Sequence, residues 1–210
     1  MRSGQGSLRY TGHLDLHKLW ERAARRAELP LAYSQGFHPQ PKMSIVAALP
    51  LGFFSRCEVI DMRLEQDISL DGLVEKLNAT MPEGIRVLDI EQVDERAPAL
   101  QIQVLSAEYE VHLTESVIGS DLKQRIDSVM ESESIIRSRR GKEYDLRPLI
   151  QSLECDLQEQ VPAIHMVLSA KEGATGRPEE VLDVLGIAFD ETRVERMRLI
   201  FKEIVPQDSL

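Results

Sequence analysis

The residues best suited to bind a ligand or to react lie close together, between Leu8 and Lys42. This segment holds three of the five histidines, the only tryptophan and two of the four tyrosines. Within it, residues 33–42 (YSQGFHPQPK) place a ring, an amide, a hydroxyl and an ammonium group in a loop stiffened by two prolines. Such a rigid set loses little entropy on binding, and a ring beside a cation suits an unpaired base and its phosphate. The loop residues predicted to bind are Ser34, Gln35, Gly36, Phe37, His38 and Lys42. The alternative is a plain turn whose phenyl ring packs inward.

A basic stripe precedes this loop on the helix predicted for residues 15–29. Arginines four residues apart on a helix repel each other by about 0.2–0.5 kcal/mol, a cost that an anion or an acidic partner would relieve. The alternative is an ordinary solvated face, because Glu21 can neutralise Arg25 at the same spacing. The predicted binding residues of this stripe and the segment before it are Arg9, Arg22, Arg25 and Arg26.

Three residues of the same segment are weak candidates for acid–base chemistry: His13, Asp15 and His38. His13 and Asp15 lie two residues apart at a predicted strand-to-helix junction, where they could form an acid–base pair. The alternative is that Asp15 caps the helix and His13 is a surface residue. The histidines follow no metal-binding spacing, and the chain has no Walker A loop, GxGxxG or Ser-centred elbow. We therefore expect no metal, no cofactor and a non-catalytic role.

The second half of the chain has a basic motif of its own, RSRRGK, which begins at Arg137. A glycine among arginines at a hairpin tip is a plausible phosphate contact. The predicted binding residues here are Arg139 and Arg140.

Charge is distributed unevenly along the 210 residues. The chain carries a net −10, yet residues 1–56 hold eight Lys and Arg against three acidic residues. A basic patch on an acidic protein indicates a directed anionic contact rather than general nucleic-acid binding, and we expect no binding to DNA. Two cysteines are too few for a disulfide scaffold, and no apolar run reaches the roughly 18 residues that span a bilayer. We expect a cytoplasmic protein that binds no membrane.

Hydrophobic periodicity predicts the order strand, helix, strand, strand, helix, strand in each half. In the first half it predicts strands at residues 8–13, 43–49, 57–64 and 85–93, and helices at 15–29 and 69–81. In the second half it predicts strands at 108–114, within 135–153, at 163–170 and at 194–201, and helices at 121–130 and 179–185. This order is that of the ferredoxin-like split βαβ fold. We therefore predict an α+β protein of two tandem ferredoxin-like domains with antiparallel sheets, residues 1–97 and 98–210.

The signature LRYTGHLDL…RAARRAELPLAYSQGFHPQPKMSIVAALPLGFFSRCEVIDM, followed by YDLRP and GRPEEVL, resembles a domain of unknown function found in radical-SAM-associated proteins. The resemblance covers nearly the whole chain. In that family the domain occurs beside, or fused to, a radical S-adenosylmethionine protein, so the resemblance implies such an enzyme as partner. This chain has no CxxxCxxC motif and cannot hold the iron–sulfur cluster itself.

These observations lead to one expected function and two alternatives. The expected function is an RNA-recognition or substrate-presenting module for a radical-SAM enzyme that modifies tRNA or rRNA. The first alternative, which the net charge of −10 favours, is a protein adapter that docks on that enzyme without RNA. The second is an RNA-processing or RNA-modifying enzyme with His13, His38 and Asp15 as its acid–base residues, because tandem ferredoxin-like folds also occur in such enzymes.

Overall fold

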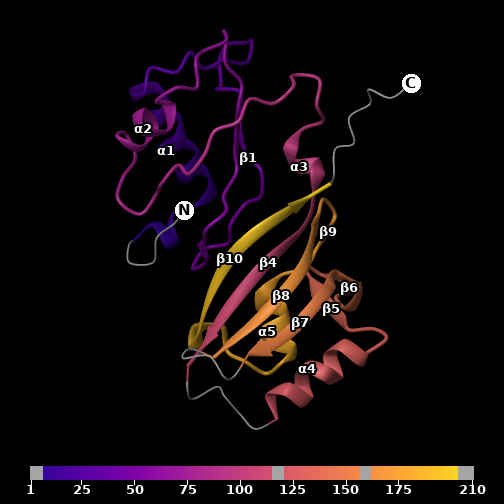
Figure 1. The fold of residues 1–210 in the computed structure, drawn as a ribbon. Helices are drawn as coiled ribbons and strands as arrows, with labels where there is room; N and C mark the ends of the chain where they lie inside the picture. Colours follow the sequence, from indigo (N-terminus) through magenta and orange to yellow (C-terminus); the bar gives the residue numbers. More distant parts are fainter. Residues whose placement is uncertain (1–6, 115–120, 157–161, 203–210) are drawn as a thin grey trace, which may run out of the picture. The chain divides into compact units, whose positions relative to one another are not determined.

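The computed structural model describes residues 7–114, 121–156 and 162–202. Contacts between Cα atoms divide the chain into two compact units, unit 1 (residues 1–101) and unit 2 (residues 102–210). Figure 1 shows the ribbon of each unit. None of the helices in the described residues has the length and apolar content that a membrane crossing requires.

Unit 1 is organised around the helix α1 (His13–Arg26), which follows a 3₁₀ turn, η1 (Ser7–Tyr10). The predicted helix is confirmed, but it starts at His13 with Gly12 at its N-cap position, so Asp15 lies inside the first turn instead of capping it. Its apolar stripe recurs at helical spacing and is buried. The buried residues of this stripe and of the turn that follows are Leu16, Ala23, Ala24 and Ala27.

Three short strands and a second helix complete unit 1. The strand β1 (Met43–Ile45) pairs with β3 (Ile60–Met62) in antiparallel orientation, and β2 (Phe54–Ser55) lies between them in sequence. The helix α2 (Leu73–Asn78) is shorter than the predicted 69–81. It lies beside α1 (Figure 1), where its Leu73 and Leu77 pack with Ala27 and the half-buried Trp20.

Two strands predicted in unit 1 are wrong. Residues 8–13 form η1 and the start of α1, because the Thr11 N–H donates to the Leu8 carbonyl at 3.0 Å and closes a local turn. Residues 85–93 form no strand, because the Asn78 side chain takes both backbone groups of Val87. Asn78 Nδ2 donates to the Val87 carbonyl at 2.9 Å, and Val87 N donates to Asn78 Oδ1 at 2.8 Å. The order βαββαβ is therefore absent from the described residues of unit 1.

Unit 2 is built on four antiparallel strands that lie side by side in the order β10–β4–β8–β7 (Figure 1). From Ala107 to Leu113 of β4, buried residues alternate with the half-buried Glu108, Glu110 and His112, as expected for a sheet with one face on the core. The short β9 pairs with the end of β8. The bounds are β4 (Val104–Leu113), β7 (Ile150–Asp156), β8 (Ala163–Lys171), β9 (Ala174–Thr175) and β10 (Thr192–Phe201), with the short helix α3 (Leu100–Gln103) before β4.

The helices α4 and α5 of unit 2 confirm their sequence predictions. The helix α4 (Leu122–Glu131) packs on β7 and buries Leu122, Ile126 and Val129. The helix α5 (Pro178–Val184) has proline in its first turn, where the missing N–H costs nothing. Arg125 of α4 donates to the Leu185 carbonyl at the C-terminal end of α5, where a positive charge also interacts favourably with the helix dipole. Two 3₁₀ turns, η3 (Arg147–Leu149) and η4 (Phe189–Glu191), connect neighbouring elements.

A separate hairpin, β5 (Ile136–Arg139) and β6 (Lys142–Asp145), is inserted between α4 and β7. Its two turn residues, Arg140 and Gly141, have φ of +52° and +76°. Positive φ at both positions is the requirement of a type I′ turn, which matches the twist of the paired strands. Taken together, the described residues form a mixed α+β structure with antiparallel sheets, as predicted, and the tandem ferredoxin-like arrangement is not confirmed.

Candidate functional site

The loop singled out in the sequence is a closed finger, defined here as residues 34–40. Ser34 N donates to the Gln40 carbonyl at 2.8 Å, and Gln40 N donates to Ser34 Oγ at 2.9 Å. Tyr33 and Pro41 form a bridge directly beneath this pair. The two ends of the finger are therefore fixed together, and Ser34 is used to close it.

Phe37 at the tip of the finger is fully exposed, with 103 % of its reference surface in solvent. The alternative in which this ring packs inward is therefore excluded. Gly36 precedes it with φ of +133°, a conformation that residues with a Cβ rarely adopt. Gln35, Gly36 and His38 are exposed as well. The finger thus holds a bare phenyl ring in solvent on a pre-ordered backbone.

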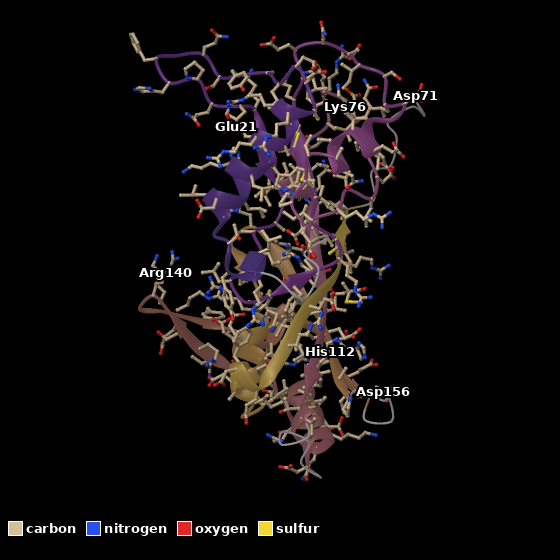
Figure 2. The ribbon with its side chains drawn as sticks, turned by 90° about the vertical axis from the view of Figure 1, so that its left-hand side faces the viewer. Glu21, Asp71, Lys76, His112, Arg140 and Asp156 are labelled. Atoms are coloured by element: carbon tan, nitrogen blue, oxygen red, sulfur yellow. The ribbon has the colours of Figure 1, made fainter. Side chains whose placement is uncertain are left out.

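Arg25 connects α1 to the base of the finger. A hydrogen bond with Tyr33, followed by the charge of Glu21, raises the pKa of the Arg25 guanidinium above its ordinary value. Glu21, labelled on α1 in Figure 2, forms an i,i+4 ion pair with Arg25. Arg25 is therefore engaged within unit 1 and has less capacity for a ligand than its neighbours on the helix.

The other cations of α1 stay available. Arg22 and Arg26 are exposed, and within the described residues neither has a hydrogen bond or an ion pair. Lys18 extends the same stripe one turn toward the N-terminus and is exposed too. Lys42, which follows the finger, is likewise exposed and without a side-chain partner in the described part of the chain. Lys18, Arg22, Arg26 and Lys42 are therefore exposed cations of unit 1 that an anion can approach.

Arg9 is half-buried and already in contact with two rings. Its guanidinium lies 4.5 Å from the centroid of Tyr10 and 5.8 Å from that of Phe54. Its carbonyl accepts a hydrogen bond from Gly52 N at 2.8 Å. Arg9 therefore stabilises the entry to α1, and the structure gives it a packing role.

The acid–base candidates are not brought together. His13 and Asp15 are both exposed on the first turn of α1, and side chains two residues apart on a helix point to different sides. His38 lies on the finger, exposed. His17 is engaged elsewhere, with Nε2 at 3.1 Å from the Met43 carbonyl. No group of three or more His, Cys, Asp or Glu residues in the described ranges has metal-binding geometry.

The two arginines predicted to bind in unit 2 differ sharply. Arg139 stacks on the Tyr144 ring at 4.6 Å and donates to the Thr175 carbonyl at 3.1 Å. It also makes a two-pronged ion pair with Glu180, in which the Nε–Oε1 distance is 3.0 Å. Arg140, labelled at the hairpin tip in Figure 2, is exposed and has no partner among the described residues. Arg140 is therefore available to a ligand, whereas Arg139 holds the hairpin against α5.

The face of the unit 2 sheet away from the core carries more acidic than basic residues. The alternation of β4 and its register with β8 and β7 place charged and imidazole side chains on this face. Figure 2 shows His112 and Asp156 on the side opposite to Arg140. No Phe, Tyr or Trp stands among the residues that the registers place there, so this face differs from the aromatic RNA-binding sheet of other small domains. Those residues are Glu108, Glu110, His112, Ser152, Glu154, Asp156, His165 and Val167, together with Arg193, Glu195 and Arg198 of β10.

Comparison with protein families gives a match over residues 3–178, to the family described as uncharacterized protein conserved in bacteria (DUF2344). The chain belongs to this family. A search of curated proteins gave no significant match. The matched residues contain the whole of α1, the finger, and the hairpin of β5 and β6. The match confirms one part of the resemblance noted in the sequence, namely that the chain is a domain of unknown function.

The sequence reasoning named only one of four polar residues that unit 1 brings together beside the finger: it named Lys42 and missed Ser44, Asp61 and Arg63. The available signal was the alternation of residues 57–64, which already set Asp61 and Arg63 on one face. The pairing of β1 with β3 adds the other two residues to that face.

Proposed function

We propose that this protein is a non-catalytic RNA-recognition module, which presents tRNA or rRNA to a radical-SAM enzyme. The observation that carries the proposal is Phe37, wholly exposed at the tip of a finger closed by two hydrogen bonds. A fully exposed ring contributes no buried apolar surface to folding. A base that stacks on it would remove apolar surface of both the ring and the base from water.

The cations near the finger in sequence support this proposal. Arg22 and Arg26 on α1 and Lys42 after the finger have no carboxylate partner among the described residues. Cations left unpaired on the surface of an acidic chain suit phosphates, which supply the larger part of RNA affinity. The ring would then stack a base while the cations hold the backbone on either side.

Unit 2 contributes a second structural argument. Without the inserted hairpin and β9, its elements follow the order β4, α4, β7, β8, α5, β10, and its sheet has the first strand between the third and the fourth. We propose that unit 2 is a ferredoxin-like domain with an inserted hairpin, a fold common among RNA-binding proteins. The acidic sheet face described above leads us to assign RNA contact to unit 1 and to the hairpin tip at Arg140.

The radical-SAM partner rests on the sequence resemblance alone. The signature between Leu8 and Asp61 is similar to the domain that accompanies radical-SAM proteins, and the chain lacks the cysteines for a cluster of its own. An accessory role follows, because the chemistry would then reside in the partner.

A protein adapter is the second candidate, and a specific observation favours it. Tyr10, at the end of η1, and Leu14, in the first turn of α1, are 61 % and 75 % exposed. Large exposed apolar side chains are more typical of protein interfaces than of RNA contacts. This candidate predicts docking through the start of α1 with no dependence on the finger.

The test is binding of the purified full chain to fluorescently labelled small RNA over a salt series. Phe37→Ala should weaken binding by about 5- to 150-fold, the range of 1–3 kcal/mol measured for one stacked base. The double change Arg22→Gln and Arg26→Gln should lower the slope of log affinity against log salt by about 1.4, because about 0.7 is lost for each single-strand phosphate contact. The control is Lys76→Gln on α2, which removes one exposed positive charge of unit 1 that already pairs with Glu28 at 3.1 Å.

Each outcome has a defined meaning. Salt-dependent binding that Phe37→Ala weakens, and that Lys76→Gln leaves unchanged, supports the module. An affinity that none of these variants alters places RNA elsewhere and overturns the assignment to the finger. The absence of RNA binding at low salt, together with capture of a radical-SAM protein that Leu14→Ser abolishes, establishes the adapter instead.

A further inference from the structure

A shallow cavity of about 220 Å³ opens on the outer face of the β1–β3 pair. Its volume is roughly seven times that of one liquid water molecule, which suits one sugar–phosphate unit. The lining residues are Lys42, Met43, Ser44, Asp61 and Arg63.

The strand pairing explains why polar side chains gather there. Met43 and Ile45 are buried, so the alternation of β1 turns Lys42 and Ser44 to the other face. In the register of the pair, Ser44 lies opposite Asp61. Arg63 N donates to the Lys42 carbonyl at 2.9 Å and continues the ladder by one pair. Two cations, a hydroxyl and a carboxylate thus lie on one face of the strand pair, on either side of the Met43–Met62 pair, which faces the other way.

The charged side chains that line this cavity lack strong partners of their own, which points to a ligand. Lys42 and Arg63 carry like charges one residue beyond the β1–β3 register, where the Arg63 N–H reaches the Lys42 carbonyl, and like charges that face each other across strands are destabilising. Neither Lys42 nor Asp61 has a side-chain hydrogen bond or ion pair in the part of the chain that the structure describes. Arg63 has one partner, Glu95, at 3.1 Å, and both of these side chains are more than half exposed. An exposed pair of this kind contributes little, so a phosphate can replace Glu95.

We propose that this cavity is a ribonucleotide subsite at the base of the finger. Lys42 and Arg63 bind a backbone phosphate, and the Asp61 carboxylate accepts a hydrogen bond from the 2′-hydroxyl of the attached ribose. The 2′-hydroxyl is the group by which a protein distinguishes RNA from DNA. The inference deepens the proposed function and rests on it, since it assigns the preference for RNA to one named side chain.

The Asp61 carboxylate favours a nucleotide over a bare anion as the ligand of this cavity. A carboxylate repels a phosphate, so Asp61 would weaken a site for inorganic phosphate or for a deoxyribose backbone. It strengthens a site whose ligand offers a hydroxyl donor next to the phosphate. The cavity also suits an RNA strand that contacts Phe37, because Lys42 follows Phe37 by five positions, a span of at most about 18 Å.

The experiment compares the affinity of the full chain for two labelled 12-mers, an RNA and a DNA of matched sequence with uracil in both. Asp61→Ala should lower the RNA affinity by about tenfold, the size of one hydrogen bond to a charged group, and leave DNA affinity equal or higher. Asp61→Asn keeps an acceptor oxygen and should retain most of the preference for RNA. Asp67→Asn, at an exposed carboxylate elsewhere in unit 1, is the control and should change neither affinity.

Two further variants test the phosphate side of the cavity. Lys42→Ala should weaken RNA and DNA alike, and Glu95→Gln should strengthen both by releasing Arg63. Thermal unfolding of each variant verifies that the fold is kept.

The failure of this inference differs from the failure of the proposed function. If wild-type protein binds RNA through Phe37 but Asp61→Ala keeps the ratio of RNA to DNA affinity, the subsite is wrong and the RNA module stands. An equal loss for RNA and DNA in Asp61→Ala also overturns the subsite. If wild-type protein binds neither 12-mer, both proposals are wrong.

Discussion

Replacing Arg139 by Ala tests whether this arginine holds the hairpin or binds a ligand. The side chain makes a two-pronged ion pair with Glu180, donates twice to the Thr175 carbonyl and stacks on Tyr144. The Arg139 and Glu180 side chains are 26 % and 16 % exposed, so the pair lies between a surface ion pair and a buried one. We therefore expect Arg139→Ala to reduce the stability of unit 2 and to leave ligand affinity unchanged.

The magnitude follows from the contacts. An exposed ion pair contributes about 0–1 kcal/mol and a hydrogen bond to a charged group about 1.5–3 kcal/mol, which gives about 1.5 kcal/mol for this partly exposed pair. The bonds to the Thr175 carbonyl add about 1 kcal/mol, and the stack on Tyr144 adds about 0.5 kcal/mol. Arg139→Ala should thus lower the free energy of unfolding by about 3 kcal/mol. Arg139→Lys, which keeps the charge and loses the two-pronged geometry, should cost about half as much.

The assay is urea denaturation of the full chain followed by far-UV circular dichroism. Hydrogen exchange of peptides from residues 163–184 then locates the change in β8 and α5. The matched control is Arg140→Ala, one residue away and exposed, which should stay within about 0.5 kcal/mol of wild type. The reasoning is refuted if Arg139→Ala costs no more than this control, or if it weakens RNA binding without a shift in unfolding.

Three further perturbations have expected outcomes. Burial alone would raise the pKa of Glu180, but hydrogen bonds from Arg139 and Tyr144 outweigh it and hold this pKa below its ordinary value of 4.5. The ionised Glu180 therefore stabilises the fold at neutral pH, and this contribution is lost as the pH falls below 4.5. Glu180→Gln should flatten the dependence of thermal stability on pH between pH 5 and pH 3. Arg140→Asn should stabilise the hairpin by about 0.5 kcal/mol in urea unfolding, because Asn accepts the positive φ of a type I′ turn more readily than Arg; an unchanged or lower midpoint would contradict this assignment of the turn. Asn78→Ala should cost about 1–3 kcal/mol because it leaves both backbone groups of the buried Val87 unpaired; rapid exchange of the Val87 amide in wild type would show that these bonds do not form.

Local periodicity was enough to predict several elements. The helices α1, α4 and α5 and the strands β4, β8 and β10 lie where their apolar spacing predicted them, because an amphipathic pattern is a property of neighbouring residues. The composition of the finger was also readable, since glycine and proline act on the backbone beside them. Residues 85–93 show the limit. Their strand-like pattern yields to the side chain of Asn78, a partner that periodicity does not reveal.

The role of each arginine was decided by tertiary structure. Arg139 and Arg140 are adjacent in one basic motif, yet Glu180, 41 residues away, engages the first and leaves the second exposed. The direction of the Phe37 ring and the meeting of Lys42 with Asp61 and Arg63 have the same origin. The sequence by itself determined which chemical groups are present and which helices form. The fold decided which of those groups keep their charges free, because ion pairs and strand registers join residues that are distant along the chain.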